Sequence, residues 1–152
     1  MKRKLVSLVL AAAMATSMMA MPVFAADDAA TEETAKSDVD LSDKKVGICI
    51  YQFSDNFMTL FRTELESYLQ ELGFAKENIT IQDGANDQAT QSNQIDAFIA
   101  DGVDLLIINP VNSSSAESIT DKVVAANIPL VYVNREPSED EEKRWEDNGW
   151  NV

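Results

Sequence analysis

Val46-Gly47-Ile48-Cys49-Ile50-Tyr51 is the stretch that decides the fold, because it is an unbroken apolar run with the length of a β-strand. Alternating polar positions would indicate a sheet with one face in water, whereas a continuous run suits a parallel strand that is covered on both faces. Two later runs, at residues 105–108 and 129–133, are also apolar throughout. The sequence therefore predicts a parallel sheet with helices on both faces.

A segment with helical periodicity follows each of the first three apolar runs. The first segment ends at Gly73, a residue suited to the left-handed conformation just past a helix end. Its apolar residues recur at helical spacing and are expected to face the sheet: Phe57, Leu60, Phe61, Leu65, Leu69 and Leu72. This alternation predicts the α/β class with a doubly wound parallel sheet and right-handed crossovers.

The later units follow the same order of strand and helix. We expect strands at residues 79–82, 103–108 and 128–133, and helices at residues 87–100 and 114–126. The fourth strand opens a unit that we expect to remain without its helix, because residues 137–148 are acidic and rich in turn-forming residues. The chain then ends where a fifth strand should begin, so we expect a truncated lobe.

The first 25 residues have the pattern of a secretory signal peptide. Lys2, Arg3 and Lys4 precede an apolar stretch at residues 5–21, and Ala25 supplies the small residue at which signal peptidase cuts. A retained membrane anchor is the alternative, because the apolar stretch approaches the length that spans a bilayer. We expect the mature chain to be periplasmic or extracellular.

The charge of the chain excludes nucleic acid as a partner. The formal net charge is −14, and removal of residues 1–25 takes 3 of the 12 Lys and Arg and none of the 26 Asp and Glu, which leaves 9 − 26 = −17. Binding to a phosphate backbone needs a basic surface. Residues 26–44 are acidic and of low hydrophobicity, and we expect them to form a disordered linker to the domain at residues 45–152.

Histidine is absent, and Cys49 is the single cysteine. The usual general base at neutral pH is therefore missing, as is the commonest metal ligand. Cys49 lies inside an apolar strand and is expected to be a buried thiol. These features exclude histidine-dependent triads and zinc sites that contain histidine, and we expect no enzyme. A pair of carboxylates for glycoside hydrolysis is the remaining catalytic alternative.

Polar residues follow the predicted strands at their carboxyl ends, where ligands bind in doubly wound sheets. The candidates are Asp55, Asn56 and Phe57 after the first strand, Asn109 after the third, and Asn134 and Arg135 after the fourth. Some polar residues at this edge also have a structural explanation. Ser54 or Asp55 is expected to cap the first helix, Asp87 the second and Ser113 the third. Capping explains neither Asn109, which precedes Pro110, nor Phe57, for which the core is the alternative place.

The first turn after the strand at residues 46–51 indicates which ligand class would fit. It contains no glycine, so the dinucleotide fingerprint and the P-loop are both absent. Carboxylate and amide groups beside an aromatic ring suit a neutral polyhydroxylated ligand, because the polar groups bond to hydroxyls while the ring covers an apolar face.

Four motifs resemble the galactose and glucose (methyl-galactoside) periplasmic binding proteins of sugar ABC importers. They are Asp55-Asn56-Phe57-Met58 after the first strand, Asn86-Asp87-Gln88 with Asn93-Gln94-Ile95-Asp96, Ile108-Asn109-Pro110-Val111, and Val133-Asn134-Arg135-Glu136-Pro137-Ser138. The resemblance extends from about Lys45 to the last residue. It implies the N-terminal lobe of a type I periplasmic binding protein, with the C-terminal lobe absent.

The resemblance also implies roles for single residues and partners. Asp55, Phe57 and Asn109 would contact a hexose such as galactose or glucose, and Asn56, Asn134 and Arg135 are candidates of second rank. No cofactor is expected, because the family's calcium site would lie in the missing lobe, and no metal ligands are assigned. The implied partners are the hexose, the permease of the ABC transporter and a chemoreceptor, and the chain is expected to be a monomer.

Two other functions are compatible with the same fold. An extracytoplasmic sugar-sensing input module for a chemoreceptor or sensor kinase would need a membrane anchor or a signalling partner. A transcriptional repressor core is disfavoured, because a DNA-binding headpiece and a basic region should be present.

The sequence predicts that this chain binds no calcium, because no segment alternates oxygen ligands around a central glycine. Residues 139–142 carry consecutive carboxylates, which cannot all face one ion. We expect calorimetric titration of the mature chain with calcium to detect no specific binding. A micromolar affinity that disappears when Glu141→Gln and Glu142→Gln are introduced together would contradict this.

Overall fold

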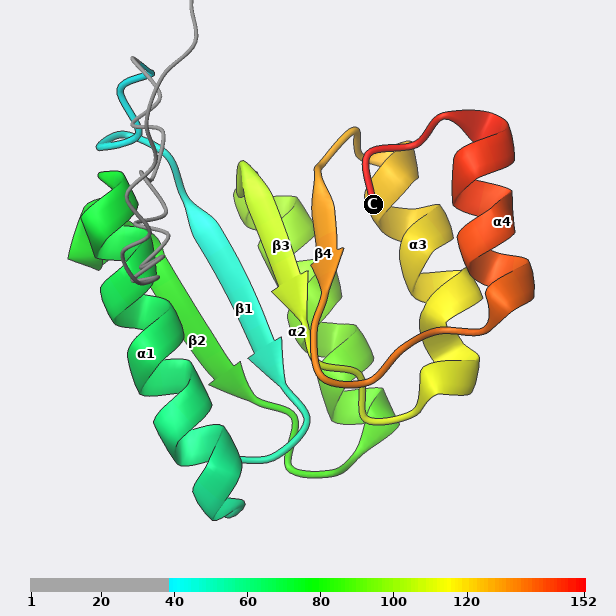
Figure 1. Cartoon of the computed structure of the whole chain (residues 1–152), viewed down its shortest axis with the longest axis horizontal. Coiled ribbons are helices and arrows are strands. Elements are labelled where there is room, and N and C mark those ends of the chain that lie inside the picture. The colour runs from blue at the N-terminus through cyan, green and yellow to red at the C-terminus, as the bar shows by residue number, and fades with distance from the viewer. Residues whose placement is uncertain (1–38) are drawn as a thin grey trace, which may run out of the picture. The chain divides into compact units, whose positions relative to one another are not determined.

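Four parallel strands form one sheet in the order β2-β1-β3-β4 (Figure 1). They are β1 (Val46–Ile50), β2 (Ile79–Asp83), β3 (Leu105–Ile108) and β4 (Leu130–Tyr132). The computed structural model describes residues 39–152, so the predicted signal peptide and most of the predicted linker lie outside the described residues. The predicted parallel sheet is confirmed, with β1 paired to β2 on one side and to β3 on the other.

Helices cover both faces of the sheet (Figure 1). They are α1 (Asn56–Leu72), α2 (Gln88–Asp101), α3 (Ala116–Ala125) and α4 (Glu139–Asn148), with short 3-10 turns at η1 (Lys76–Asn78) and η2 (Ser113–Ser115). α1 lies over one face, and α2 and α3 lie over the other. This is the doubly wound arrangement that the alternation of strand and helix predicts. None of the described helices is both long enough and apolar enough to cross a bilayer.

The core consists of two layers of apolar side chains, one on each face of the sheet. Ile48 and Ile50 pack on the α1 side, whereas Cys49 packs with residues of α2 and α3. All five residues of β1 are buried, and burial raises the pKa of the Cys49 thiol to about 12. Gly47 is required by close packing, because a Cβ atom there would lie 2.7 Å from Cγ of Phe98. The unbroken apolar run is therefore explained by a strand with two covered faces.

The buried face of α1 agrees with the predicted stripe in part, because Leu69 is buried and Phe61 and Leu65 pack against the core. Met58 and Leu69 are the buried residues of this helix, while Phe57 and Leu60 are about 60% exposed (61% and 62%), and Leu72 is also exposed. The predicted inward positions of Phe57, Leu60 and Leu72 are therefore wrong. Met58 and Leu69 are separated by eleven residues, which is about three helical turns, so the buried row follows their phase.

Two of the three predicted helix caps are confirmed. Asp55 accepts hydrogen bonds from the backbone N–H groups of Phe57 and Met58, and Asp87 accepts one from Thr90. The predicted cap by Ser113 is wrong. The side chain of Asn112 accepts from the N–H of Ser114 instead, because a 3-10 turn precedes α3 and moves the start of the helical segment toward the N-terminus.

Residues 139–148 form a helix, so the prediction of an acidic turn without a helix is wrong. Ser138 caps α4, and four acidic residues occupy its first turn, where negative charge stabilises the positive end of the helix dipole. Trp145 stacks on Tyr132 of β4 with the ring centroids 5.5 Å apart. Beyond α4, the carbonyl of Asn151 accepts a hydrogen bond from the N–H of Leu130.

Glu141 is a buried carboxylate whose hydrogen-bond partners Arg144 and Trp145 lie in the same helix, α4. Glu141 is 6% exposed and accepts from Nε and Nη2 of Arg144, each at 2.8 Å, and from Nε1 of Trp145 at 2.6 Å. Burial would raise the pKa of Glu141, but the hydrogen bonds from Arg144 and Trp145 outweigh it, so the pKa lies below its usual value. Arg144 also bonds to Asp121, which ties α4 to α3.

Removal of the Arg144 guanidinium should destabilise the domain, because it leaves the Glu141 carboxylate buried without its main partner. We expect Arg144→Met to lower the free energy of unfolding at pH 7 by about 2 to 3 kcal/mol in urea denaturation. Because the folded pKa of Glu141 is lowered, its contribution is present above its unfolded pKa and is lost as the pH falls through the folded pKa.

Lys122→Met is the matched control, since Lys122 forms an exposed pair with Asp96. It should change the free energy of unfolding by less than about 1 kcal/mol. Equal losses for the two variants would show that the Glu141 cluster stabilises no more than a surface ion pair.

Candidate functional site

The carboxyl ends of the strands continue in register into the loops that follow them. The backbone N–H groups of Gly84, Asn109 and Val133 donate to the carbonyls of Ile50, Cys49 and Ile108, respectively. These bonds extend the strand pairing beyond the ends of β2, β3 and β4. The predicted site residues are therefore gathered at one edge of the sheet, as the parallel order requires.

Asp55 lies at the first turn and uses both carboxylate oxygens. Oδ1 accepts from the N–H groups of Phe57 and Met58 at 2.7 and 3.1 Å, and Oδ2 accepts from the hydroxyl of Tyr51 at 2.5 Å. The Tyr51 hydroxyl, followed by these backbone groups, lowers the pKa of Asp55, which is ionised at neutral pH. A carboxylate has about four acceptor positions, so Asp55 retains capacity for a ligand hydroxyl.

Arg135 connects the ends of β1, β3 and β4. Its guanidinium lies 3.9 Å from the centre of the Tyr51 ring, a cation–π contact. Nη1 also donates to the carbonyls of Pro110 and Val111, at 3.1 and 2.5 Å. Arg135 follows the exposed Asn134, whose left-handed backbone (φ 63°) turns the chain after β4. Arg135 is thus a structural brace at the position where a ligand contact was predicted.

Asn109 forms the floor of the edge and is fully buried (0% exposed). Its side-chain N–H donates to the sulfur of Met58 at 2.9 Å, and its Oδ1 has no hydrogen-bond partner within residues 39–152. Methionine sulfur is a weak acceptor, so the amide is poorly satisfied at both ends. A buried acceptor without a hydrogen bond destabilises a folded protein. The Asn109 amide could therefore gain stability from a further hydrogen-bond donor.

Phe57 and Asn56 lie at the rim of the edge, at the start of α1. Both are exposed, and the Phe57 ring stacks on Phe61 with centroids 6.3 Å apart. The alternative of a core position for Phe57 is therefore wrong. An exposed aromatic ring next to an ionised carboxylate can cover an apolar face of a ligand while Asp55 accepts its hydroxyls.

Three residues of the edge were missed by sequence reasoning. Tyr51 was assigned to the apolar strand, Met58 was not included in the predicted stripe, and Gln91 was given no role. Gln91 is fully buried in α2 and bonds to both sides of Pro110. Its signal in the sequence is a polar residue one turn before Ile95, on the face of α2 that packs on the sheet.

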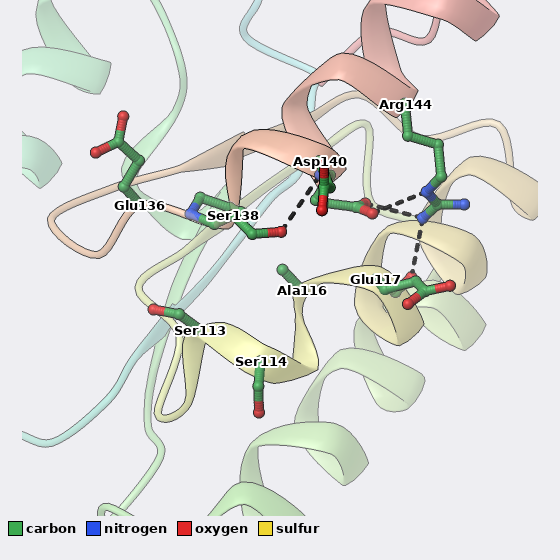
Figure 2. A pocket seen from close by; sticks show the side chains of 10 residues that line it. Ser113, Ser114, Ala116, Glu117, Glu136, Ser138, Asp140 and Arg144 are labelled. Carbon is green, nitrogen blue, oxygen red and sulfur yellow. Dashed lines mark hydrogen bonds and ion pairs between the residues drawn. The ribbon is translucent and has the colours of Figure 1, made fainter.

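A pocket of about 640 Å³ lies beside this edge, between the segment that starts α3 and the first turn of α4 (Figure 2). Hydroxyls and carboxylates line it: Ser113, Ser114, Glu117, Glu136, Ser138 and Asp140. Arg144 in its wall is already paired with Glu141. None of the predicted site residues lines this pocket. The part of the chain that the structure describes contains no group of three or more Cys, Asp or Glu side chains suited to a metal ion.

Tyr51→Phe should raise the pKa of Asp55 toward its ordinary value, because the Tyr51 hydroxyl is the largest cause of the lowering. The contribution of Asp55 to folding stability is present above its unfolded pKa and is lost as the pH falls through its folded pKa. Acid destabilisation should therefore begin at a higher pH in the variant. A carboxyl NMR titration measures this directly.

Tyr68→Phe provides the control, since Tyr68 is an exposed tyrosine of α1, the helix that Asp55 caps. It should leave the Asp55 titration unchanged. An unchanged titration in Tyr51→Phe as well would show that the hydroxyl does not stabilise the carboxylate.

Comparison with known proteins identifies the family. Residues 46–145 match the family described as periplasmic binding protein domain. The chain is 35% identical over 96 residues to the D-galactose/methyl-galactoside binding periplasmic protein MglB of Haemophilus influenzae, which covers 63% of this chain and 28% of that protein. The chain thus spans less than a third of the length of this relative.

Solved structures give the same result. A solute binding protein of an ABC transporter from Bacillus halodurans C-125, with bound myo-inositol, has a TM-score of 0.56 and 30% identity, covering 68% of this chain and 35% of that one. The binding component of the arabinose ABC transporter from Shewanella sp. ANA-3 has a TM-score of 0.59 and 25% identity, covering 66% and 32%. The parallel sheet with helices on both faces matches a lobe of these proteins, and the chain belongs to the periplasmic binding protein domain family.

Proposed function

We propose that this chain contributes the N-terminal lobe of the solute-binding subunit of an ABC sugar importer, and that it binds a hexose such as galactose or glucose outside the cytoplasm. The observation that carries the proposal is the ionised Asp55 carboxylate, which accepts from the backbone N–H of Phe57, a residue with an exposed ring, at the carboxyl edge of a parallel sheet. A carboxylate that accepts hydroxyl groups and a ring that covers carbon–hydrogen bonds together suit one face of a sugar.

The relatives support a cyclic polyhydroxylated ligand. One is named for D-galactose and methyl-galactoside, and the two solved structures have myo-inositol and arabinofuranose bound. These ligands share adjacent hydroxyls on a ring and carry no charge that the acidic edge would repel. Galactose and glucose are the first hexoses to test, since the motifs around Asp55 and Asn109 resemble the galactose branch.

Asn109 would contribute from the floor of the site. Its Oδ1 is an acceptor without a partner, and its amide N–H groups face only the weak sulfur acceptor of Met58. A ligand hydroxyl that reaches this amide would replace poor hydrogen bonds with good ones. Asn56, Asn134 and Arg135 lie around the same edge as contacts of second rank.

The proposed partners follow from this role. The chain would deliver its sugar to the permease of the transporter and act as a binding protein, not as an enzyme. A chemoreceptor is a further partner, and a monomer is the expected state. A site on one lobe contacts one face of the sugar and leaves the other in water, so this chain alone should bind in the millimolar range or more weakly.

Asp55→Ala should weaken galactose binding by about tenfold or more, because a charge-assisted hydrogen bond to a hydroxyl is lost. The measurement is a titration of the isotope-labelled chain with galactose and with glucose, followed by amide NMR shifts, which quantify millimolar dissociation constants.

Asp87→Ala is the matched control, because Asp87 caps α2 as Asp55 caps α1. Both variants lose a helix cap, but only Asp55→Ala should lose affinity. Equal dissociation constants for the two variants would leave capping as the only role of Asp55, and no shifts with any cyclic polyol would reject sugar binding by this edge.

A further inference from the structure

The turn Asn109-Pro110-Val111 has a partner for every one of its backbone polar groups. The N–H of Asn109 donates to Cys49 of β1, and the carbonyls of Pro110 and Val111 accept from Arg135. The two remaining groups are the carbonyl of Asn109 and the N–H of Val111. The side-chain amide of Gln91 bonds to both, at 2.9 and 2.8 Å.

Gln91 reaches this turn from α2, whereas Arg135 reaches it from the segment after β4. Gln91 is fully buried, and it donates with Nε2 while it accepts with Oε1. The donor and the acceptor of this buried amide are both hydrogen-bonded. Movement of the turn would break one of these bonds and leave a buried polar group without a partner, so the amide and the turn hold each other in a defined position. The backbone of Asn109 is therefore fixed on both sides of Pro110.

The side chain of Asn109 itself has no comparable anchor. Its N–H donates only to the sulfur of Met58, and its Oδ1 has no partner among the described residues. The position of this amide therefore depends on the Asn109 backbone, whose N–H is held by Cys49 and whose carbonyl is held by Gln91.

We propose that Gln91 is a positioning residue for the ligand site, which holds the Asn109 amide at the floor of the edge by bonding to the backbone on both sides of Pro110. This inference rests on the proposed function for its effect on sugar affinity, but the effect on Asn109 does not need a ligand. Gln91 does not touch the sugar, and it acts through Asn109.

The test compares two glutamines of α2 that bond to backbone groups at the carboxyl ends of strands, Gln91 after β3 and Gln94 at the end of β2. Gln94 donates to the carbonyl of Asp83 at 2.6 Å and has no bond to the Asn109 turn, so Gln94→Met is the matched control for Gln91→Met. Methionine keeps the length of the side chain and removes the amide. Both variants should lose stability, but only Gln91→Met should move the side-chain amide NMR signals of Asn109 in the free protein.

The effect on binding is measured as a double-mutant cycle with Asn109→Ala. Gln91→Met should weaken galactose binding by about tenfold, in line with the loss of a well-placed hydrogen bond, and Gln94→Met should weaken it by much less. In the Asn109→Ala background, Gln91→Met should cause no further loss. A purely structural role would give the same loss in both backgrounds and would overturn the proposal.

The free-protein signals separate this inference from the proposed function. Displaced Asn109 signals in Gln91→Met without any sugar binding would support the positioning role and reject the sugar site. Unmoved Asn109 signals would reject the positioning role whether or not sugar binds. If Gln91→Met does not fold, Gln91→Asn is used in its place. The asparagine side chain is shorter by one methylene, so its amide cannot bond to both the Asn109 carbonyl and the Val111 N–H.

Discussion

The constraint on which this structure depends is the hydrogen bonding of backbone groups where buried parallel strands leave the sheet. β1 is covered on both faces, so the groups that follow it cannot rely on water. Side chains from other elements supply the missing partners: Asp83 accepts from the N–H of Phe53, and Gln91 and Arg135 bond to the turn after β3. The polar side chains at this edge are therefore needed for folding, because the backbone groups at the strand ends require hydrogen-bond partners.

The same side chains then carry the chemistry that a ligand would use. Asp55 caps α1 by accepting from its first backbone N–H groups, and it also accepts a hydrogen bond from the Tyr51 hydroxyl. Its carboxylate nevertheless remains ionised at the rim. Arg135 braces the turn after β3 through one nitrogen, which leaves its other donors for further contacts. Under the proposed function, a residue at this edge would have a structural and a binding role together. A control residue that has only the structural role is needed to separate the two.

The strands and the doubly wound order could be predicted because continuous apolar runs reflect burial on two faces, and the caps Asp55 and Asp87 could be predicted because helix starts need acceptors. Periodicity gave the core side of α1 for Phe61, Leu65 and Leu69, but it could not separate the buried Met58 from the exposed Leu60, because both are apolar. The acidic residues of α4 were interpreted as a turn because only their number was considered. Their position in the first turn of a helix, where negative charge is stabilising, was not considered. The role of Gln91 needs a contact to a turn eighteen residues away, which no local pattern contains.

The site has a rim and a floor with different properties. Phe57 and Asp55 lie at the rim, where the ring of the proposed sugar would meet an exposed aromatic face and a charged acceptor. Asn109 lies beneath, closed off by its contact to the Met58 sulfur. Because sulfur is a weak acceptor, a hydroxyl can replace this contact at little energetic loss, while Gln91 keeps the backbone in place. Selection among sugars at this edge would thus depend on whether a hydroxyl reaches the floor after the ring has settled on the rim.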